Sequence, residues 1–336
     1  MLILLARLNL QEKFIVVLYK CWEIHMKILV TGCSGFIGSW VAQKAVENGH
    51  IVVGIDNLSS NVNYTPQKVE FYHQDLNSDL QKPMQGIDAI VHLAAYAQLR
   101  DNWKDRSERE KLFKNNELGT LSVLEQMPSV PIIFMSSASV YGSLYQTQKR
   151  ALTEDDANSY TIESPYAASK LSCESYIAAW AYKKQNPWYA LRLVNQVGAR
   201  THRGVIVDFC RMVRENKHIH ALDNGEQKKS WVSVYDTVDV IMTLLDQEKN
   251  IPSGAYNVTS SETWSWRDIV GVMEKMHYEK NPNSQKPFTL SYAEKLTGSV
   301  GDPTNIYVSS NKLDKYITCN RSVESAVRDT LTYLKW

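Results

Sequence analysis

The sequence predicts an α/β protein in which a doubly wound parallel sheet is followed by a smaller α/β part. Three observations support this fold class. Short apolar runs suited to buried parallel strands alternate with helix-like segments up to about residue 195. The first run leads through a glycine-rich turn into a segment with one apolar helical stripe. Beyond residue 195 the elements become shorter and loop residues more frequent, without a clear linker.

The first strand–helix–strand unit has the pattern of a dinucleotide-binding, Rossmann-type turn. An apolar strand over 28–30 is followed by three glycines, which are Gly32, Gly35 and Gly38. Glycines let the backbone approach a pyrophosphate, which the N–H groups of the next helix face. A second strand over 51–53 leads to Asp56, about 20 residues after the turn. A carboxylate there accepts hydrogen bonds from a ribose 2′-OH and repels a 2′-phosphate, which favours NAD over NADP.

The remaining elements of the parallel sheet follow from their apolar runs. Strands are expected over 69–73, 88–93, 131–136 and 188–193, and helices over 108–126 and 166–184. Pro165 stands where the second helix begins, a position at which proline is favoured. We therefore divide the chain into an N-terminal extension (1–25), an NAD-binding Rossmann domain (26–195) and a mainly substrate-binding part (196–336).

The N-terminal extension precedes Met26, directly before the first strand. Its two apolar patches are interrupted by Arg7, Glu12 and Lys13, and neither is long enough to span a bilayer. No basic region precedes the apolar run and no small-residue cleavage site follows it, so the pattern of a signal peptide is not met. We expect an upstream translation start that adds little function, with an accessory strand or helix as the alternative.

The composition indicates a globular protein without an electrostatic preference. Of the 336 residues 44% are hydrophobic and 22% charged, and 37 Lys and Arg nearly balance 36 Asp and Glu. We therefore expect neither a nucleic-acid partner nor a membrane partner. The five cysteines are scattered singly, without metal-ligand spacing. We expect no metal site, reduced thiols and a cytoplasmic location.

A second constellation consists of Ser137, Tyr166 and Lys170. Tyr166 and Lys170 are four residues apart in SPYAASK, so they share one helix face. A free phenol has a pKa near 10, and a nearby ammonium and an oxidised nicotinamide both favour the phenolate. The phenolate would take a proton from a substrate hydroxyl while hydride leaves the same carbon. Ser137 follows a strand at the carboxyl edge of the sheet, where its hydroxyl is placed to hold the reacting oxygen.

An isolated Tyr-x-x-x-Lys pair is usually a packed tyrosine with a solvated lysine one turn further on. Here the pair follows a complete NAD-binding unit and a serine-rich strand end. We therefore interpret the three residues as catalytic.

With these motifs the chain resembles the extended short-chain dehydrogenase/reductases, specifically the NAD-dependent nucleotide-sugar epimerase/dehydratase group. The similarity runs from Met26 nearly to the C-terminus. It rests on motifs in family order, which are TGCSGFIG, DNLSS, QDL, VHLAA, NNELGT, SSASVYG, SPYAASK, LRLVNQVG, GEQKKSWVSVYD and YNVTS.

The resemblance implies a set of site residues. The pyrophosphate and ribose of NAD would contact Gly32, Gly35, Phe36, Ile37, Gly38, Asp56 and Asn57. The adenine and the middle of the cofactor would contact Asp75, Leu76, Leu93, Ala94, Ala95 and Asn116. Ser137, Tyr166 and Lys170 match the family's catalytic trio, of which Tyr166 and Lys170 would also touch NAD. Asn195 matches the asparagine that meets the nucleotide diphosphate, and the helices around Leu118 and Leu171 match those of a four-helix homodimer interface.

Within this group the sequence looks most like a 4-epimerase acting on a nucleotide sugar. The sugar 4,6-dehydratases carry an Asp-Glu pair where Ala138 and Ser139 stand, and decarboxylating relatives usually have a glutamate at the position of Ser139. The alternatives are a nucleotide-sugar 4-ketoreductase or another oxidoreductase of the family, a non-catalytic NAD-binding regulator, and an idle paralogue.

Three departures from the family concern its basic residues. Lys229 stands where an arginine often reaches the substrate phosphate, and a lysine lacks the bidentate fork. Residues 299–302 are Ser-Val-Gly-Asp where the family has Arg-Pro-Gly-Asp. Ala97 replaces a cofactor-binding lysine of the UDP-galactose 4-epimerases. Arg100, Arg200 and Arg203 are candidates to compensate, although each is also readily explained as a surface charge.

Overall fold

The structure is a computed structural model that describes residues 25–60, 63–64, 67–97, 105–221, 225–246, 250–292 and 305–336. The predictions for residues 1–24, for Arg100 and for the 299–302 motif therefore lie outside the described residues.

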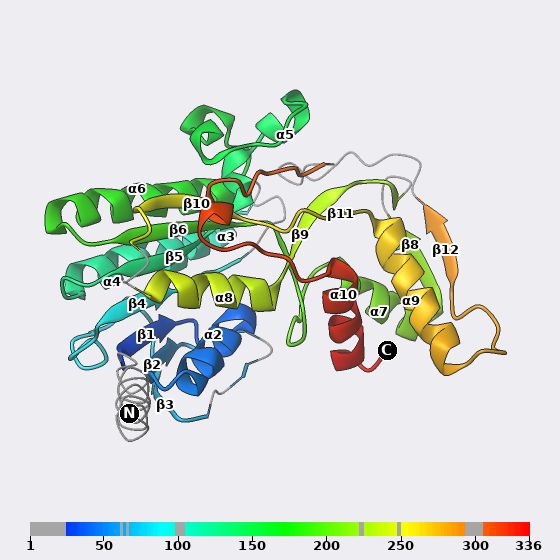
Figure 1. Ribbon diagram of the computed structural model, residues 1–336, viewed down its shortest axis with the longest axis horizontal. Coiled ribbons are helices and arrows are strands. Elements are labelled where there is room, and N and C mark those ends of the chain that lie inside the picture. Colours follow the sequence, from blue (N-terminus) through cyan, green and yellow to red (C-terminus); the bar gives the residue numbers. More distant parts are fainter. Residues whose placement is uncertain are drawn as a thin grey trace, which may run out of the picture.

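A seven-stranded parallel sheet forms the centre of the described chain (Figure 1). Its strands are β1 (Lys27–Thr31), β2 (Ile51–Asp56), β3 (Val69–His73), β4 (Ala89–His92), β5 (Ile132–Ser137), β6 (Trp188–Leu193) and β10 (Gly254–Val258). Their order is β10-β6-β5-β4-β1-β2-β3, and every neighbouring pair is parallel. The strand order reverses between β1 and β4, which is where doubly wound sheets bind ligands at the carboxyl ends of their strands. The predicted fold class is confirmed.

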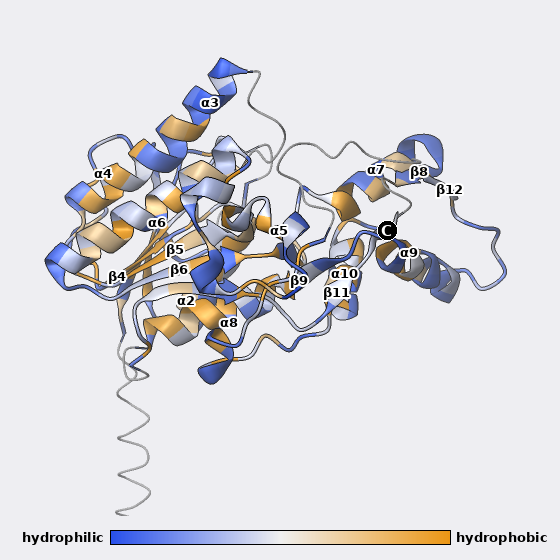
Figure 2. Cartoon of the chain, turned by 90° about the horizontal axis from the view of Figure 1, so that it is seen from above, coloured by the Kyte–Doolittle hydropathy of each residue, from blue (hydrophilic) through white to orange (hydrophobic). Residues whose placement is uncertain are grey.

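Helices cover both faces of this sheet, which explains why its inner strands β1 and β4 are buried along almost their whole length. Ile28 and Val30 of β1 face a core with α2 (Phe36–Glu47) and α8 (Val234–Leu245). Leu29, between them, faces the opposite core with α4 (Gly119–Gln126) and α6 (Pro165–Lys184). Figure 2 shows the hydrophobic strands between these helices. Each fully buried aliphatic side chain contributes about 1.5–3 kcal/mol to folding.

The C-terminal part has its own sheets and core. Its three-stranded sheet consists of β7 (Asn195–Val197), β9 (Lys229–Ser233) and β11 (Thr263–Trp264), and its two-stranded sheet of β8 (His218–Ala221) and β12 (Thr289–Tyr292). A second hydrophobic core lies among these strands and the helices α7 (Val205–Asn216), α9 (Trp266–Lys280) and α10 (Val323–Tyr333). However, two elements from beyond residue 195 belong to the large sheet: β10 is its edge strand, and α8 packs on one of its faces. The two structural units therefore do not follow the division of the sequence at 195.

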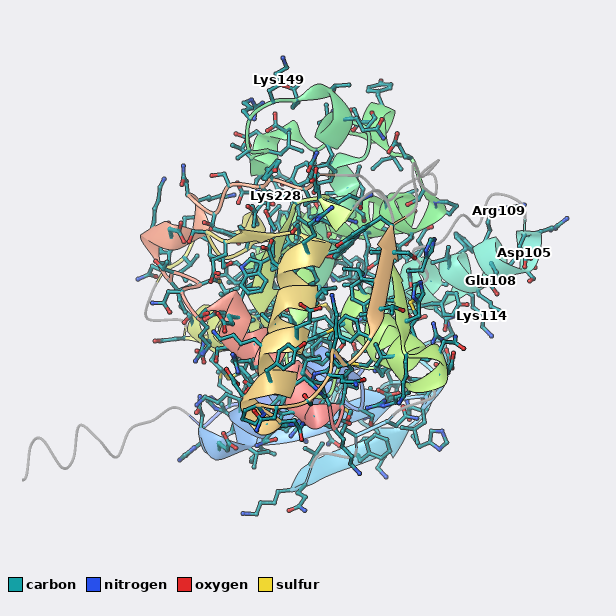
Figure 3. The ribbon with its side chains drawn as sticks, turned by 90° about the vertical axis from the view of Figure 1, so that its right-hand side faces the viewer. Asp105, Glu108, Arg109, Lys114, Lys149 and Lys228 are labelled. Atoms are coloured by element: carbon teal, nitrogen blue, oxygen red, sulfur yellow. The ribbon has the colours of Figure 1, made fainter. Side chains whose placement is uncertain are left out.

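The helix expected over 108–126 is longer and irregular. It begins with α3 (Arg106–Leu112), where the Asp105 side chain accepts a hydrogen bond from the Ser107 N–H at 2.9 Å. It passes through a π-helical segment (Phe113–Leu118) and ends with α4. Figure 3 shows Asp105, Glu108, Arg109 and Lys114 along the part of this helix that projects from the molecule. A short helix, α5 (Leu144–Thr147), follows β5. Within the described ranges, no helix combines the length and the apolar character needed to cross a membrane.

Candidate active site

A cavity of about 1350 Å³ lies between the carboxyl ends of the large sheet and the C-terminal part. Small-molecule sites usually measure about 300–1000 Å³, so this cavity has room for more than one ligand of ordinary size. With the exception of Asn116, every predicted site residue lines it. These residues are Gly32, Gly35, Phe36, Ile37, Gly38, Asp56, Asn57, Asp75, Leu76, Leu93, Ala94, Ala95, Ser137, Tyr166, Lys170, Asn195 and Lys229.

The glycine turn between β1 and α2 is a cradle that side chains would fill. Gly32 has φ +70°, and a Cβ there would lie 2.8 Å from the backbone N of Ala94. A Cβ on Gly38 would lie 2.0 Å from the carbonyl oxygen of Gly32. The helix α2 begins at this turn without a side-chain cap at Gly35. The N–H groups of such an uncapped first turn are suited to binding an anion.

The carboxyl ends of β2 and β3 lead to two acidic groups, Asp56 and Asp75, that local hydrogen bonds hold in place. Asp56 Oδ2 accepts from the Ser34 N–H at 2.9 Å, and Oδ1 accepts from the Leu58 N–H at 2.8 Å. Asn57 Nδ2 donates to Asp75 Oδ2 at 3.4 Å. Burial alone would raise the pKa of Asp75, but hydrogen bonds from Asn77 and Asn57 outweigh it and lower that pKa. This wall therefore presents carboxylates in the same cavity as the glycine turn.

The middle wall of the cavity is fixed by a buried polar chain that sequence reasoning missed. The Thr31 hydroxyl lies 2.7 Å from His92 Nδ1, and His92 Nε2 lies 3.0 Å from the Thr120 hydroxyl. Thr31 Oγ1 also accepts from the N–H groups of Leu93 and Ala94, both at 3.2 Å. Burial and the charge of Lys170 lower the pKa of His92 to about 3, so this histidine is neutral. The signal in the sequence was a single histidine at the end of an otherwise apolar strand.

Asn116 lies behind the wall rather than on it. The π-helical segment turns its side chain inward, where it is 2% exposed. Its Oδ1 accepts from the Tyr96 N–H at 2.7 Å, and its Nδ2 donates to Tyr96 O at 3.2 Å and to Ser169 Oγ at 3.0 Å. Ser169 Oγ in turn donates to Tyr166 O at 2.8 Å. In this geometry Asn116 joins the wall after Ala95 to the start of α6, and its direct contact with the cofactor stays a prediction.

The three candidate catalytic residues meet on one wall of the cavity. Ser164 caps α6 by accepting from the Ala167 N–H at 3.2 Å, and Pro165 is its first helical residue. Tyr166 and Lys170 therefore lie one turn apart at the start of this helix. Lys170 Nζ donates to Met135 O on β5 at 2.7 Å and lies 5.9 Å from the centre of the Tyr166 ring. Ser137 ends β5, and its Oγ accepts from the Ser139 N–H at 3.2 Å.

The pKa of Tyr166 in the protein alone differs from the sequence-based expectation of a phenol made acidic by Lys170. Burial raises the pKa of Tyr166 to about 12, against the lowering effects of the Ser137 hydrogen bond and the charge of Arg203. Burial also lowers the pKa of Lys170 to about 8, against the raising effects of Cys173 and Glu174. The protein alone therefore keeps Tyr166 neutral at pH 7 and Lys170 mostly protonated. An ionised Tyr166 needs further positive charge in the cavity.

The C-terminal part contributes the opposite wall. Asn195 Nδ2 donates to Ser230 O at 3.0 Å, which joins β7 to β9 beside the cavity. Lys229 on β9 is 3% exposed, and its Nζ lies 5.2 Å from the ring centre of Trp266. An ammonium group and an indole ring thus stand together at this end.

The candidate compensating arginines lie in different places. Arg203 lines the cavity, and its Nη1 donates to the carbonyl oxygen of Ala97 at 2.7 Å. Its charge therefore lies beside residue 97, where the sequence has alanine. The Arg200 guanidinium instead stacks 3.6 Å from the centre of the Trp40 ring and hydrogen bonds to Gln43 on α2.

No acidic pair stands directly after Ser137 in the cavity. Ala138 and Ser139 occupy the two positions, and both line the wall. Among the described residues, no group of three or more His, Cys, Asp or Glu side chains is arranged to hold a metal ion. The reactive groups of this wall are thus a phenol, a lysine and a hydroxyl.

Comparisons with known proteins agree with this site. The sequence profile of the NAD dependent epimerase/dehydratase family matches residues 28–259. A UDP-glucose 4-epimerase from Streptococcus mutans is 28% identical over 85% of this chain and 89% of the relative. Another from Pisum sativum is 27% identical over 92% of this chain and 95% of the relative. The crystal structure of UDP-glucuronic acid 4-epimerase from Bacillus cereus, in complex with UDP-glucuronic acid and NAD, has a TM-score of 0.79 at 26% identity, covering 92% of this chain and 99% of that chain.

Proposed function

Because the chain belongs to the NAD-dependent epimerase/dehydratase family, we propose that it is a nucleotide-sugar 4-epimerase. The observation that carries the proposal is the meeting of Ser137, Tyr166 and Lys170 on one wall of a cavity large enough for two ligands. The absence of an acidic pair at Ala138 and Ser139 favours epimerisation over the elimination of water. The similarity to UDP-glucose and UDP-glucuronic acid 4-epimerases supports a UDP-linked sugar.

The cofactor is NAD, and the described cavity fits it. The glycine cradle leaves space for a pyrophosphate where a Cβ on Gly32 or Gly38 would overlap the backbone. Asp56 would accept the ribose hydroxyls, and Leu93, Ala94 and Ala95 would contact the middle of the dinucleotide. Bound NAD would accept a hydride and later give the same hydride back, so the reaction has no net redox change.

The residues of the chain would control the proton of the sugar 4-hydroxyl. Tyr166 would accept this proton, and it would return the proton to the 4-oxygen once the 4-keto sugar has turned over and its C4 carbon has been reduced on the opposite face. Ser137 would donate a hydrogen bond to the same oxygen. Lys170 and Arg203 would stabilise negative charge on the phenol, because both are cationic at neutral pH and lie beside it. Lys170, with a pKa of about 8, would lose this effect above that pH.

The C-terminal wall would bind the nucleotide diphosphate. Asn195 and Lys229 are the proposed contacts, and both line the cavity opposite the catalytic wall. Lys229 supplies one positive charge without the bidentate geometry of an arginine. The contact of its ammonium group with the Trp266 ring holds that charge at one place on the wall.

A panel of UDP-, dTDP-, GDP- and CDP-sugars tests the proposed function. We expect NMR to show the 4-epimer of at least one sugar, with bound NAD and no accumulation of NADH. Protein that lacks bound NAD and consumes NADH in equal amount with a 4-keto sugar would instead be a 4-ketoreductase. Protein that retains NAD but converts none of the sugars would contradict catalysis and indicate a regulator or an idle paralogue.

We further propose that the protein is a homodimer formed through α6 and the π-helical segment. These two elements pack on one another, with Ser172 Oγ donating to Glu117 at 3.0 Å. Three large apolar side chains of these elements are open to solvent: Phe113 is 51%, Leu118 39% and Tyr176 40% exposed. Their exposure supports a protein interface here, and a second copy of the chain would cover them symmetrically.

Replacing both Phe113 and Leu118 with glutamate is expected to give a monomer. Two charges would have to be buried without partners at the interface, which costs several kcal/mol. Sedimentation velocity of the wild type and the double variant measures this directly. Tyr160→Glu is the matched control, because Tyr160 is 97% exposed on a separate turn and should leave the dimer intact. A wild-type protein that sediments as a monomer would contradict the dimer.

A further inference from the structure

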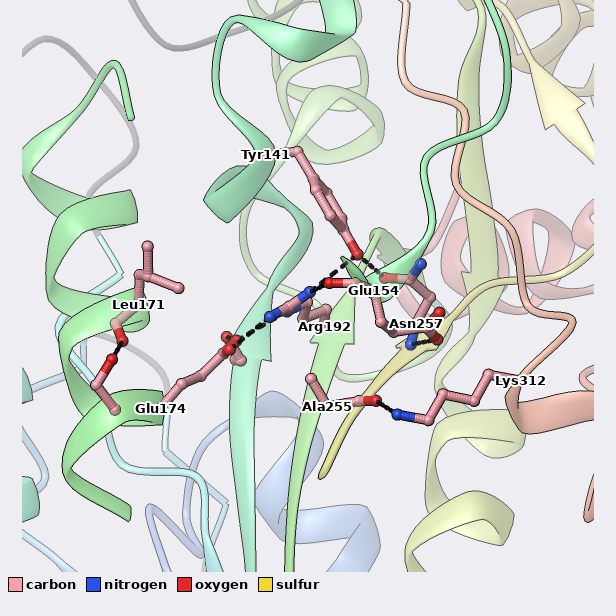
Figure 4. Close-up of polar contacts among 10 residues, drawn as sticks. Tyr141, Glu154, Leu171, Glu174, Arg192, Ala255, Asn257 and Lys312 are labelled. Atoms are coloured by element: carbon pink, nitrogen blue, oxygen red, sulfur yellow. Dashed lines mark hydrogen bonds and ion pairs between the residues drawn. The ribbon is translucent and has the colours of Figure 1, made fainter. Parts of the chain in front are cut away.

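A buried polar network contacts the chain on both sides of Ser137, and Figure 4 shows its centre around Arg192. We call it the Arg192 network; its members are Ser136, Tyr141, Glu154, Glu174, Arg192 and Asn257. At its centre Arg192 on β6 and Glu174 on α6 form a bidentate ion pair, with Nη2 to Oε2 at 2.8 Å and Nε to Oε1 at 3.0 Å. Both side chains are only 7% exposed.

The network holds the chain on both sides of Ser137. Just before it, Ser136 Oγ donates to Glu174 Oε1 at 2.5 Å. Just after it, Arg192 Nη1 donates to the hydroxyl of Tyr141 at 3.2 Å. The guanidinium group of Arg192 thus contacts the segment after Ser137 directly. It is linked to the segment before Ser137 through the carboxylate of Glu174. Within the described part of the chain no hydrogen bond joins Ser137 itself to this ion pair, so the network acts on Ser137 through its two flanking segments.

The same network holds the helix that carries the other two candidate catalytic residues. Tyr166, Lys170 and Glu174 follow one another at intervals of four residues on one face of α6. Lys170 contacts β5 at Met135 O, and Glu174 contacts it at the next residue, Ser136. These two contacts hold α6 against the strand that ends in Ser137, and the ion pair with Arg192 fixes the Glu174 carboxylate that makes one of them.

The remaining hydrogen bonds of the network are satisfied as well. Arg192 Nη1 also donates to the carbonyl oxygen of Glu154 at 2.6 Å. The Tyr141 hydroxyl donates to Asn257 Oδ1 at 2.6 Å, and the Asn257 N–H donates to the Glu154 carboxylate at 2.8 Å. A completely satisfied buried network is rigid. Stability alone is a weak reason for a buried ion pair, since apolar residues of the same size often stabilise a protein equally well.

We propose that Arg192 is a positioning residue, which together with Glu174 holds the Ser137 hydroxyl opposite the Tyr166 phenol. This inference rests on the proposed function of Ser137 and Tyr166. Neither Arg192 nor Glu174 lines the cavity, so their effect on the reaction is exerted through the geometry of the catalytic wall.

Arg192→Lys is the principal test. Lysine keeps the charge beside Glu174, but its single ammonium group cannot contact Glu174, Tyr141 and the Glu154 carbonyl together. A displacement of about 1 Å can lower turnover about 100-fold. We expect kcat for the nucleotide sugar identified by the panel to fall about 10- to 100-fold, with KM changed less than about threefold.

Two milder variants and a matched control accompany it. Ser136→Ala and Tyr141→Phe each remove one hydrogen bond between the network and a segment next to Ser137, without a change in charge. Each should lower kcat by less than Arg192→Lys, and neither should lower it much further in the Arg192→Lys background, because interacting residues are not additive. Tyr189→Phe is the control: it removes a buried hydrogen bond from the same strand, Tyr189 Oη to Ile251 O at 3.0 Å, away from Ser137. It should lower the melting temperature while kcat stays unchanged.

The pH profile separates positioning from stability. The groups that face Tyr166 are Ser137 from β5, Lys170 and Cys173 from α6, and Arg203 from the loop before α7. Of these, the hydrogen bond from Ser137 lowers the pKa of Tyr166. The acidic limb of the kcat profile should therefore move to higher pH in Arg192→Lys and stay in place in Tyr189→Phe.

Crystal structures give a readout that does not depend on turnover. In Arg192→Lys we expect Ser137 Oγ to move away from the Tyr166 hydroxyl by about 1 Å, with no such movement in Tyr189→Phe. Unchanged kcat and an unchanged Ser137 position in Arg192→Lys would overturn the positioning role. If the wild type converts no nucleotide sugar, the proposed function fails, while the crystal structures still decide the role of Arg192.

Discussion

Tyr166→Phe is expected to lower nucleotide-sugar turnover by about 10²- to 10⁴-fold while NAD stays bound. The variant keeps the ring but removes the only oxygen of Tyr166 that can accept the proton of the sugar hydroxyl. The phenol is buried beside Lys170 and Ser137, so no water replaces it at low cost. The glycine cradle and Asp56 are unaffected, because they belong to β1, α2 and β2.

Turnover is measured by NMR on the sugar identified by the panel, and bound NAD by absorbance after denaturation of the protein. Tyr256→Phe is the matched control, since its hydroxyl is also largely buried and donates to Pro252 O at 2.5 Å, outside the cavity lining. It should lose about 1 kcal/mol of stability and retain its turnover. Turnover of Tyr166→Phe within threefold of the wild type would remove the phenol from the mechanism.

Gly38→Ala is expected to weaken NAD binding by at least about 100-fold and to destabilise the protein by about 2–4 kcal/mol. The added Cβ would lie 2.0 Å from the carbonyl oxygen and 2.8 Å from the carbonyl carbon of Gly32. Both are backbone atoms, so relief of the overlap requires α2 or the turn to move. That movement would alter the surface on which the pyrophosphate should rest.

Calorimetric titration with NAD and thermal unfolding measure the two effects. Gly271→Ala provides the control, because Gly271 is an exposed residue in α9 and a Cβ there meets no atom within 4 Å. An alanine in a helix is favoured over glycine by about 0.5–1 kcal/mol, so this variant should be slightly more stable and bind NAD normally. Normal NAD affinity in Gly38→Ala would mean that the cofactor does not approach the turn.

The sequence predicts the first half of the fold well because its strands are bounded apolar runs. The strands expected over 69–73 and 188–193 coincide with β3 and β6, and the helix after Ser164 differs from α6 by one residue. The second half carries weaker signals, since β11 has only two residues and β8 and β12 four each. The return of β10 to the large sheet is a long-range pairing with β6, which no local periodicity encodes.

The candidate site could be predicted from motifs as far as it consists of cavity-lining residues. The motifs do not reveal the buried hydrogen bonds that hold the cavity-lining residues in place. His92 and its two threonine partners come from three elements, and the Asn116 side chain bonds to the Tyr96 backbone because the π-helical segment turns it inward. The ionisation of Tyr166 also depends on burial, which raises its pKa in the folded protein and is invisible in the spacing of Tyr166 and Lys170.

The pairing of β10 with β6 has a consequence for engineering. A fragment that stops at residue 195 would expose the outer edge of β6 and lose α8, which covers one face of the sheet. Open strand edges of this kind recruit other chains and aggregate. Chimaeras that exchange sugar specificity between relatives should therefore retain residues 234–258 with the cofactor-binding half, and graft only the segments around them.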